Sequence, residues 1–223
     1  MFSDIDFAFI AVQYISLLFA LCFHEAAHAF MALRCGDDTA KLMGRTTLDP
    51  RAHVDPIGTI VMPLLMFVTQ FPFLIGWAKP VPFNPARLNN MRRDPVLIAM
   101  AGPASNLLLG IAGTFVLRGV VLSMGINDVE VMLNTPAVMG LFYFTIINFA
   151  LMLFNLLPIP PLDGHYVLDY YLPPRGKEML RSIGPFGIIF IIMFGRHIIG
   201  PPLNLLLAFV AGFAIHGFGV LGL

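Results

Sequence analysis

The sequence predicts an all-α protein that crosses a membrane several times, and three observations lead to this fold class. Apolar residues make up 58% of the 223 positions and charged residues 12%, whereas an average soluble domain has about 25% charged residues. Several apolar runs reach or exceed the roughly 20 residues that a membrane helix needs. The 13 basic and 13 acidic residues cancel, so the net charge gives no argument for nucleic-acid binding. We therefore expect contact with a lipid bilayer and none with nucleic acid.

Five to six transmembrane helices are expected, in the order of the apolar runs. The runs extend from Ile5 to Leu33, Ile57 to Trp77, Val96 to Met124, Ala137 to Leu157 and Ile183 to Leu223. The last run is interrupted by Gly195, Arg196, Pro201 and Pro202, which predicts two short helices. Because the sequence shows no repeat or linker, we expect one integral membrane domain over residues 1–223. Its core is placed at 5–170 and its C-terminal helices at 183–223.

A short β or re-entrant region is expected between the first and third apolar runs. Pro80 and Pro82 are two residues apart, so in an extended chain both remove N–H donors from the same edge. The opposite edge stays able to pair, which favours an edge strand from Trp77 to Phe83. A proline-rich loop is the alternative.

The pattern H-E-x-x-H at His24, Glu25 and His28 carries the strongest chemical signal. Residues four apart fall on one face of a helix, so both imidazoles can reach one metal ion. Glu25 is then placed beside the water that completes the coordination of a zinc hydrolase. Inside a membrane each ionisable side chain costs at least about 2.5 kcal/mol, and a bound metal offsets this cost. A polar cluster hydrogen-bonded to neighbouring helices is the alternative.

A zinc hydrolase needs a third protein ligand, and Asp163 is the best placed carboxylate. It follows the fourth apolar run, whereas most other acidic residues lie in polar loops where a solvated charge needs no explanation. Pro158 must end or kink the preceding helix, and Gly164 frees the backbone to turn. We expect Asp163 at a broken helix end near the membrane surface, with an ordinary helix-terminating acid as the alternative.

At these motifs the sequence resembles the site-2 proteases, zinc metalloproteases that cut substrates within the membrane. H-E-x-x-H matches at 24–28, A-G-P-x-x-N at 101–106 and N-x-x-P-x-P-x-L-D-G at 155–164. The segments DPIGT (55–59) and GWAKPVPFNP (76–85) resemble the small prokaryotic branch, and no PDZ or CBS module is expected. The resemblance implies His24, His28 and Asp163 as ligands of one zinc ion per chain, and Glu25 as the catalytic base.

The resemblance implies hydrolysis of a peptide bond in or near the transmembrane segment of a membrane-spanning protein substrate. Asn155 lies eight residues before Asp163 and is a candidate oxyanion or substrate donor, while Asn106 is expected to join helices. Candidate residues for pairing with unwound substrate are Trp77, Lys79, Val81 and Phe83. The rival function is a transporter or channel that uses the His, Glu and Asp cluster as an ion or proton path.

The distribution of charge predicts the orientation in the membrane. Lys and Arg follow the first, second and fourth runs, whereas the segment 125–136 has none. By the positive-inside rule all three basic loops face the cytoplasm, which cannot hold if the run from Ile57 to Trp77 crosses once. We therefore expect this run to be a re-entrant or hairpin element. The active site is expected nearer the cytoplasmic side of a prokaryotic cell (inner) membrane.

Overall fold

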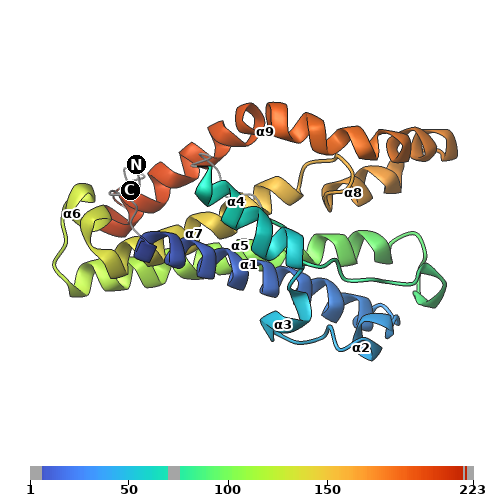
Figure 1. The fold of residues 1–223 in the computed structure, drawn as a ribbon, viewed down its shortest axis with the longest axis horizontal. Coiled ribbons are helices and arrows are strands. Elements are labelled where there is room, and N and C mark those ends of the chain that lie inside the picture. Colours follow the sequence, from blue (N-terminus) through green and yellow to red (C-terminus); the bar gives the residue numbers. More distant parts are fainter. Residues whose placement is uncertain (1–6, 70–75, 218, 220–223) are drawn as a thin grey trace.

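The computed structural model describes residues 7–69, 76–217 and 219, and the described part is mostly helical. The helices are α1 (Phe7–Arg34), α2 (Thr39–Leu42), α3 (Pro50–His53), the π-helical η1 (Pro56–Val61), α4 (Met62–Val68), the 3-10 turn η2 (Pro85–Arg87), α5 (Asp94–Ser123), α6 (Val129–Asn134), α7 (Pro136–Asn155), α8 (Gly164–Tyr171) and α9 (Pro174–His216). Helices α1, α5 and α7 run side by side, and α9 packs against α5 and α7 (Figure 1).

Four stretches of these helices are long and apolar enough to cross a membrane. They are Ile10–Arg34, Asp94–Ser123, Pro136–Asn155 and His197–His216. The chain is therefore an all-α polytopic membrane protein, and the predicted fold class is confirmed. The described residues contain four such stretches, fewer than the five to six membrane helices predicted. The difference arises in the C-terminal region, which forms α9, and in the second apolar run, which forms η1 and α4.

The C-terminal region contains one long helix where two short ones were predicted. Helix α9 continues through Gly195, Pro201 and Pro202 without a break, and Figure 1 shows that it bends along its length. A proline removes one backbone hydrogen bond, but ending the helix inside a bilayer would leave several peptide groups unpaired. A bend is the less costly outcome, so the prolines do not end the helix.

The two ends of the second apolar run lie next to each other. The run forms η1 and α4, whose apolar stretch Pro56–Met66 is too short for a crossing. The N–H of Trp77 donates to the carbonyl of Gly58 at 3.2 Å, and the hydroxyl of Thr59 donates to the carbonyl of Trp77 at 2.8 Å. Both ends of the run therefore meet, as the hairpin prediction requires; residues 70–75 of the run lie outside the described part.

The segment 76–84 is extended, but the predicted edge strand is wrong, because the described residues contain no strand. The donors expected on its open edge are bound inside the molecule. The N–H of Lys79 donates to the carbonyl of His53 at 2.8 Å, and the N–H of Val81 donates to the carboxylate of Glu25 at 3.1 Å. These acceptors belong to short helices and a side chain, so no regular ladder forms.

The apolar core lies where α5, α7 and α9 meet. It includes the buried side chains of Leu117, Phe142 and Val210, one from each of these helices. Helices α5 and α7 approach closely at Gly110, which has no side chain. A Cβ at this position would lie only 2.7 Å from the ring of Phe149. This packing sets the rotation of α5 and α7, and with it the side chains that both helices present to α1.

Candidate metal centre

The two histidines of the H-E-x-x-H pattern meet Asp163 in the interior of the helix bundle. His24 and His28 lie one turn apart on α1 and are 4% and 8% exposed. The Oδ2 atom of Asp163, from the turn after α7, is 3.0 Å from Nε2 of His24 and 3.4 Å from Nε2 of His28. One potential ligand atom from each residue lies within 4.8 Å of the other two. The structure thus brings together the three predicted ligands.

Asn106 fixes the tautomer of His24. Its amide nitrogen donates to the carbonyl of Ala20 at 3.2 Å and to Oδ1 of Asn148 at 2.9 Å. Because a carbonyl only accepts, the amide oxygen of Asn106 must face His24, where it lies 2.6 Å from Nδ1. Nδ1 therefore carries the proton, and in the neutral ring Nε2 keeps its lone pair for a metal.

His28 is held in the same way by the backbone of α5. Its Nδ1 lies 2.7 Å from the carbonyl of Ile98, an acceptor that again requires a proton on Nδ1. Nε2 of both imidazoles thus faces Oδ2 of Asp163. In the neutral rings these two nitrogens and the carboxylate offer lone pairs at one place, which is a donor set that zinc binds. The hydrogen bonds to neighbouring helices use Nδ1 only, so both Nε2 atoms stay directed at the place of the ion.

Gly102 of α5 keeps the space between the ligands open. A Cβ at this position would lie 2.5 Å from Nε2 of both His24 and His28. Zinc binds imidazole nitrogen at about 2.0–2.1 Å, so a methyl group here would compete with the metal for the same space. Ile98, Gly102 and Asn106 follow one another at intervals of four residues, and this stripe of α5 forms the wall opposite the two histidines.

A tight turn positions Asp163. The N–H of Ile159 donates to the carbonyl of Leu157 at 2.8 Å, and only glycine fits at 164, because a Cβ there would overlap the Leu156 carbonyl. Helix α9 supports the turn from outside, since a Cβ on Gly187 would overlap the carbonyl of Pro160. The third ligand is thus held by packed backbone rather than by a solvated loop, which argues against an ordinary helix-terminating acid.

Glu25 lies beside the ligands without joining them. Its carboxylate belongs to the same turn of α1 as His24, but it is not among the three converging groups. One of its oxygens, Oε2, accepts the 3.1 Å hydrogen bond from the N–H of Val81. This position suits a base that acts next to a metal, which is the role that the sequence predicts.

The contacts of the two asparagines add to what the sequence predicts. The amide of Asn155, the predicted oxyanion or substrate donor, donates to the carbonyl of Leu151 in its own helix at 3.1 Å. Asn106 joins α5 to α1 and α7 as predicted, and it also contacts His24 directly. Asn106 lies one turn after Gly102 in the A-G-P-x-x-N motif, and this position was the sequence signal for a contact near the histidines. Asn148 completes this buried chain of side chains, and only its place as a polar residue inside an apolar run could have indicated it.

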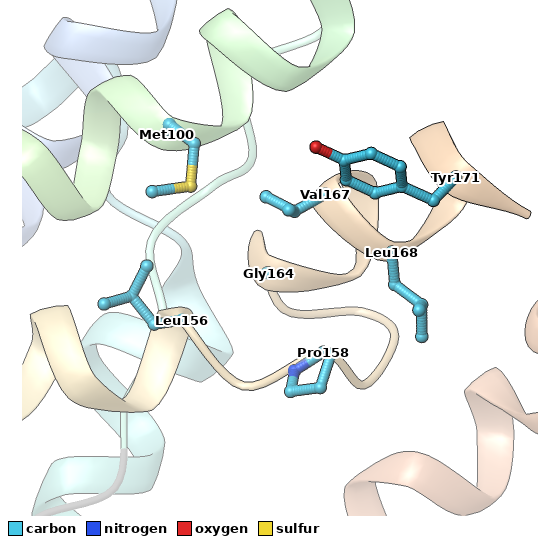
Figure 2. A pocket seen from close by; sticks show the side chains of 7 residues that line it. All are labelled: Met100, Leu156, Pro158, Gly164, Val167, Leu168 and Tyr171. Carbon is cyan, nitrogen blue, oxygen red and sulfur yellow. The ribbon is translucent and has the colours of Figure 1, made fainter.

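An apolar cavity of about 360 Å³ borders the turn that carries Asp163. Figure 2 shows Met100 of α5 and Leu156 at the end of α7 on one side, and Val167, Leu168 and Tyr171 of α8 on the other. Pro158 and Gly164 complete its lining. The surroundings of the turn are therefore suited to apolar groups.

Comparisons with known proteins agree with this chemistry. The sequence model of peptidase family M50 matches residues 120–195. The chain is 37% identical over 197 residues to "Putative zinc metalloprotease YwhC" of Bacillus subtilis. The aligned part covers 85% of the chain and 84% of the relative. It is 30% identical over 190 residues to "Putative zinc metalloprotease Rip2" of Mycobacterium tuberculosis, covering 84% of the chain and 66% of the relative. No solved structure matches the chain.

Proposed function

This zinc metalloprotease belongs to peptidase family M50, the site-2 protease family, and from that premise we propose that it hydrolyses peptide bonds in or near transmembrane segments of other proteins. One observation carries the proposal. The three candidate ligand atoms converge inside the bundle, and two of them come from Ile10–Arg34, a stretch able to cross a membrane. A hydrolytic centre at this depth reaches peptide bonds that are themselves in or near the bilayer. Membership of a peptidase family also weighs against the rival transporter or channel.

The side chains around the centre have separate proposed roles in metal binding and proton transfer. His24, His28 and Asp163 would hold one zinc ion per chain, with Asn106 and the carbonyl of Ile98 fixing the imidazoles. Zinc makes water acidic near neutral pH and polarises a substrate carbonyl. Glu25 would take the proton from the attacking water and pass it to the leaving amine. Asn155 stays a candidate oxyanion donor through the second N–H of its amide, since one N–H binds Leu151.

The substrate must be unwound before its backbone is accessible, and the segment 76–84 supplies an extended partner. The N–H groups of Trp77, Lys79 and Val81 are bound internally. The opposite edge therefore presents the carbonyls at positions 78, 80 and 82 and the N–H of Ala78, because Pro80 and Pro82 have no N–H. We propose that substrate N–H groups pair with these carbonyls, whereas the side chains of Trp77, Lys79, Val81 and Phe83 flank the bound chain.

The proposed orientation places the metal centre nearer the cytoplasmic side. Figure 1 shows α2 and α8 toward one end of the bundle and α6 at the other. The loops near α2 and α8 are basic, whereas the segment 125–136 around α6 has no Lys or Arg, so the positive-inside rule puts α6 outside. The hydrogen bond between Trp77 and Gly58 supports a hairpin that keeps the first two basic loops on one side. Because the matched relatives are bacterial, we place the single domain in a bacterial cell membrane.

The test is cleavage by purified protein in proteoliposomes. A panel of single-span proteins is incubated with wild type and with Glu25→Gln, each with and without 1,10-phenanthroline. We expect wild type to release fragments cut in or near the span, the chelator to stop cleavage, and added zinc to restore it. Cleavage by Glu25→Gln at the wild-type rate, or cleavage only of soluble loops far from the span, would contradict the proposal.

A further inference from the structure

The extended segment reaches the proposed catalytic base through its backbone. The N–H of Val81 donates to Oε2 of Glu25 at 3.1 Å, joining positions 56 residues apart in the chain. Glu25 is half-buried on α1 and has three rotatable side-chain bonds, so without such a contact it would sample several rotamers. The contact uses one carboxylate oxygen and leaves Oε1 for a proton.

The backbone donor is itself fixed by anchors on both sides. Towards the N-terminus, Trp77 donates to Gly58 at 3.2 Å and Lys79 donates to His53 at 2.8 Å. Towards the C-terminus, the N–H of Asn84 donates to Oδ2 of Asp37 at 2.5 Å.

Asp37 is a charged and buried anchor. Its side chain has no exposed surface, and its second oxygen, Oδ1, accepts from both the N–H and the hydroxyl of Thr39. Although burial by itself raises the pKa of Asp37, the hydrogen bonds from Thr39 and Asn84 lower it below its usual value. The segment is therefore tied down by an ionised carboxylate that lies just beyond α1, the helix that carries Glu25.

We propose that the backbone N–H of Val81 is a positioning group for Glu25, so that one edge of segment 76–84 holds the base while the other edge receives substrate. The inference rests on the proposed function, because it assigns a role to Glu25 in hydrolysis. A base held in one rotamer meets the attacking water in a reactive geometry in every encounter. Because both edges belong to segment 76–84, this segment fixes the position of Glu25 relative to the bound substrate.

The first test is a double-mutant cycle on ligand affinity. Acetohydroxamic acid chelates zinc and brings an acidic hydroxyl beside the carboxylate base, so its Kd reports where Glu25 is held. Calorimetric titration compares zinc-loaded wild type, Val81→Pro, Glu25→Ala and the double variant. Since a hydrogen bond to a charged group is being removed, we expect Val81→Pro to weaken binding about tenfold in the wild-type background. In the Glu25→Ala background it should have no further effect.

Lys79→Pro is the matched control for the cycle. It also removes one anchoring N–H from the segment, but its acceptor is the carbonyl of His53 rather than Glu25. Its effect on the Kd should be the same with and without Glu25, which gives a coupling of zero. Equal coupling of Lys79→Pro and Val81→Pro to Glu25 would overturn the proposal and leave only a general role for the segment.

A second measurement does not depend on the folding of a proline variant. Amide hydrogen exchange is followed in the peptide 78–83, where Pro80 and Pro82 contribute no amide. In Glu25→Ala the Val81 amide should exchange faster than in wild type, while the Lys79 amide keeps its protection. Unchanged exchange at Val81 would overturn the inference. If wild type holds no zinc and binds no hydroxamate, the proposed function fails first and the inference falls with it.

Discussion

Gly102 shows how a single missing side chain can determine a metal site. Its Cβ position lies 2.5 Å from Nε2 of both His24 and His28. We predict that Gly102→Ala removes most of the zinc and the activity, because the methyl group occupies the space of the ion. Metal analysis of purified protein checks this result. Gly119→Ala is the control on the same helix, since no described atom lies within 4 Å of its Cβ position; zinc loss in both variants would point to a general effect on α5.

Asn106 is the second residue on which the centre depends. Asn106→Leu removes the acceptor for Nδ1 of His24 and leaves Oδ1 of Asn148 without this donor. Loss of a group that orients a metal ligand typically costs about 10–100-fold in metal affinity, and we expect a loss in this range from chelator competition. Asn155→Leu should leave zinc affinity unchanged, because its amide binds Leu151. Equal affinities for the two variants would refute the assignment.

At the residue scale, the sequence predicts what is local and misses what depends on helix rotation. The pairing of His24 with His28 follows from a spacing of four, and Asp163 was found because Pro158 and Gly164 mark a broken helix end. Asn106 lies 82 positions from His24. Its contact depends on how α5 is rotated against α1, and packing deep in the bundle decides this rotation.

At the element scale, the extended segment shows a different limit of sequence reasoning. Alternation along a strand tells which residues share an edge, but not which edge faces the protein. The donors of Lys79 and Val81 were predicted to be open, yet both are bound internally. Proline substitutions at these two positions therefore test the attachment of the segment and of Glu25 rather than pairing with substrate.

Helix α9 should influence the metal centre through the turn that it supports. A Cβ on Gly187 would overlap the carbonyl of Pro160, so Gly187→Ala must displace α9 or the turn that ends in Asp163. Overpacking of this kind costs about 1–3 kcal/mol, and we expect a lower thermal unfolding midpoint together with lower zinc occupancy. Gly200→Ala, where no described atom lies within 4 Å of the Cβ position, serves as the control. Full zinc occupancy in Gly187→Ala would show that the turn does not rely on α9.

At the scale of the whole molecule, the apolar runs predicted the architecture better than the number of crossings. Hydropathy identifies apolar stretches but cannot distinguish a span from a hairpin. The contact between Trp77 and Gly58, which joins the ends of the second run, supports the hairpin. Charge patterning predicts the same topology, because a single crossing would put two basic loops on opposite sides.

Labelling of introduced cysteines in sealed vesicles tests this topology. Arg51→Cys and Arg87→Cys should react with a membrane-impermeant maleimide from the same face, and Glu130→Cys from the other. All three positions are exposed, whereas the natural Cys22 and Cys35 are buried. Labelling of Arg51→Cys and Arg87→Cys from opposite faces would mean that the second run crosses the membrane once.

The most direct test of the central claim measures zinc content and cleavage in the same proteoliposomes. Wild type should hold about one zinc ion per chain by the three-ligand rule and cut a single-span substrate. Glu25→Gln should keep the zinc and lose cleavage, while Asp163→Ala should lose both. If Asp163→Ala kept full zinc and full cleavage, the centre formed by His24, His28 and Asp163 would not be the catalytic site.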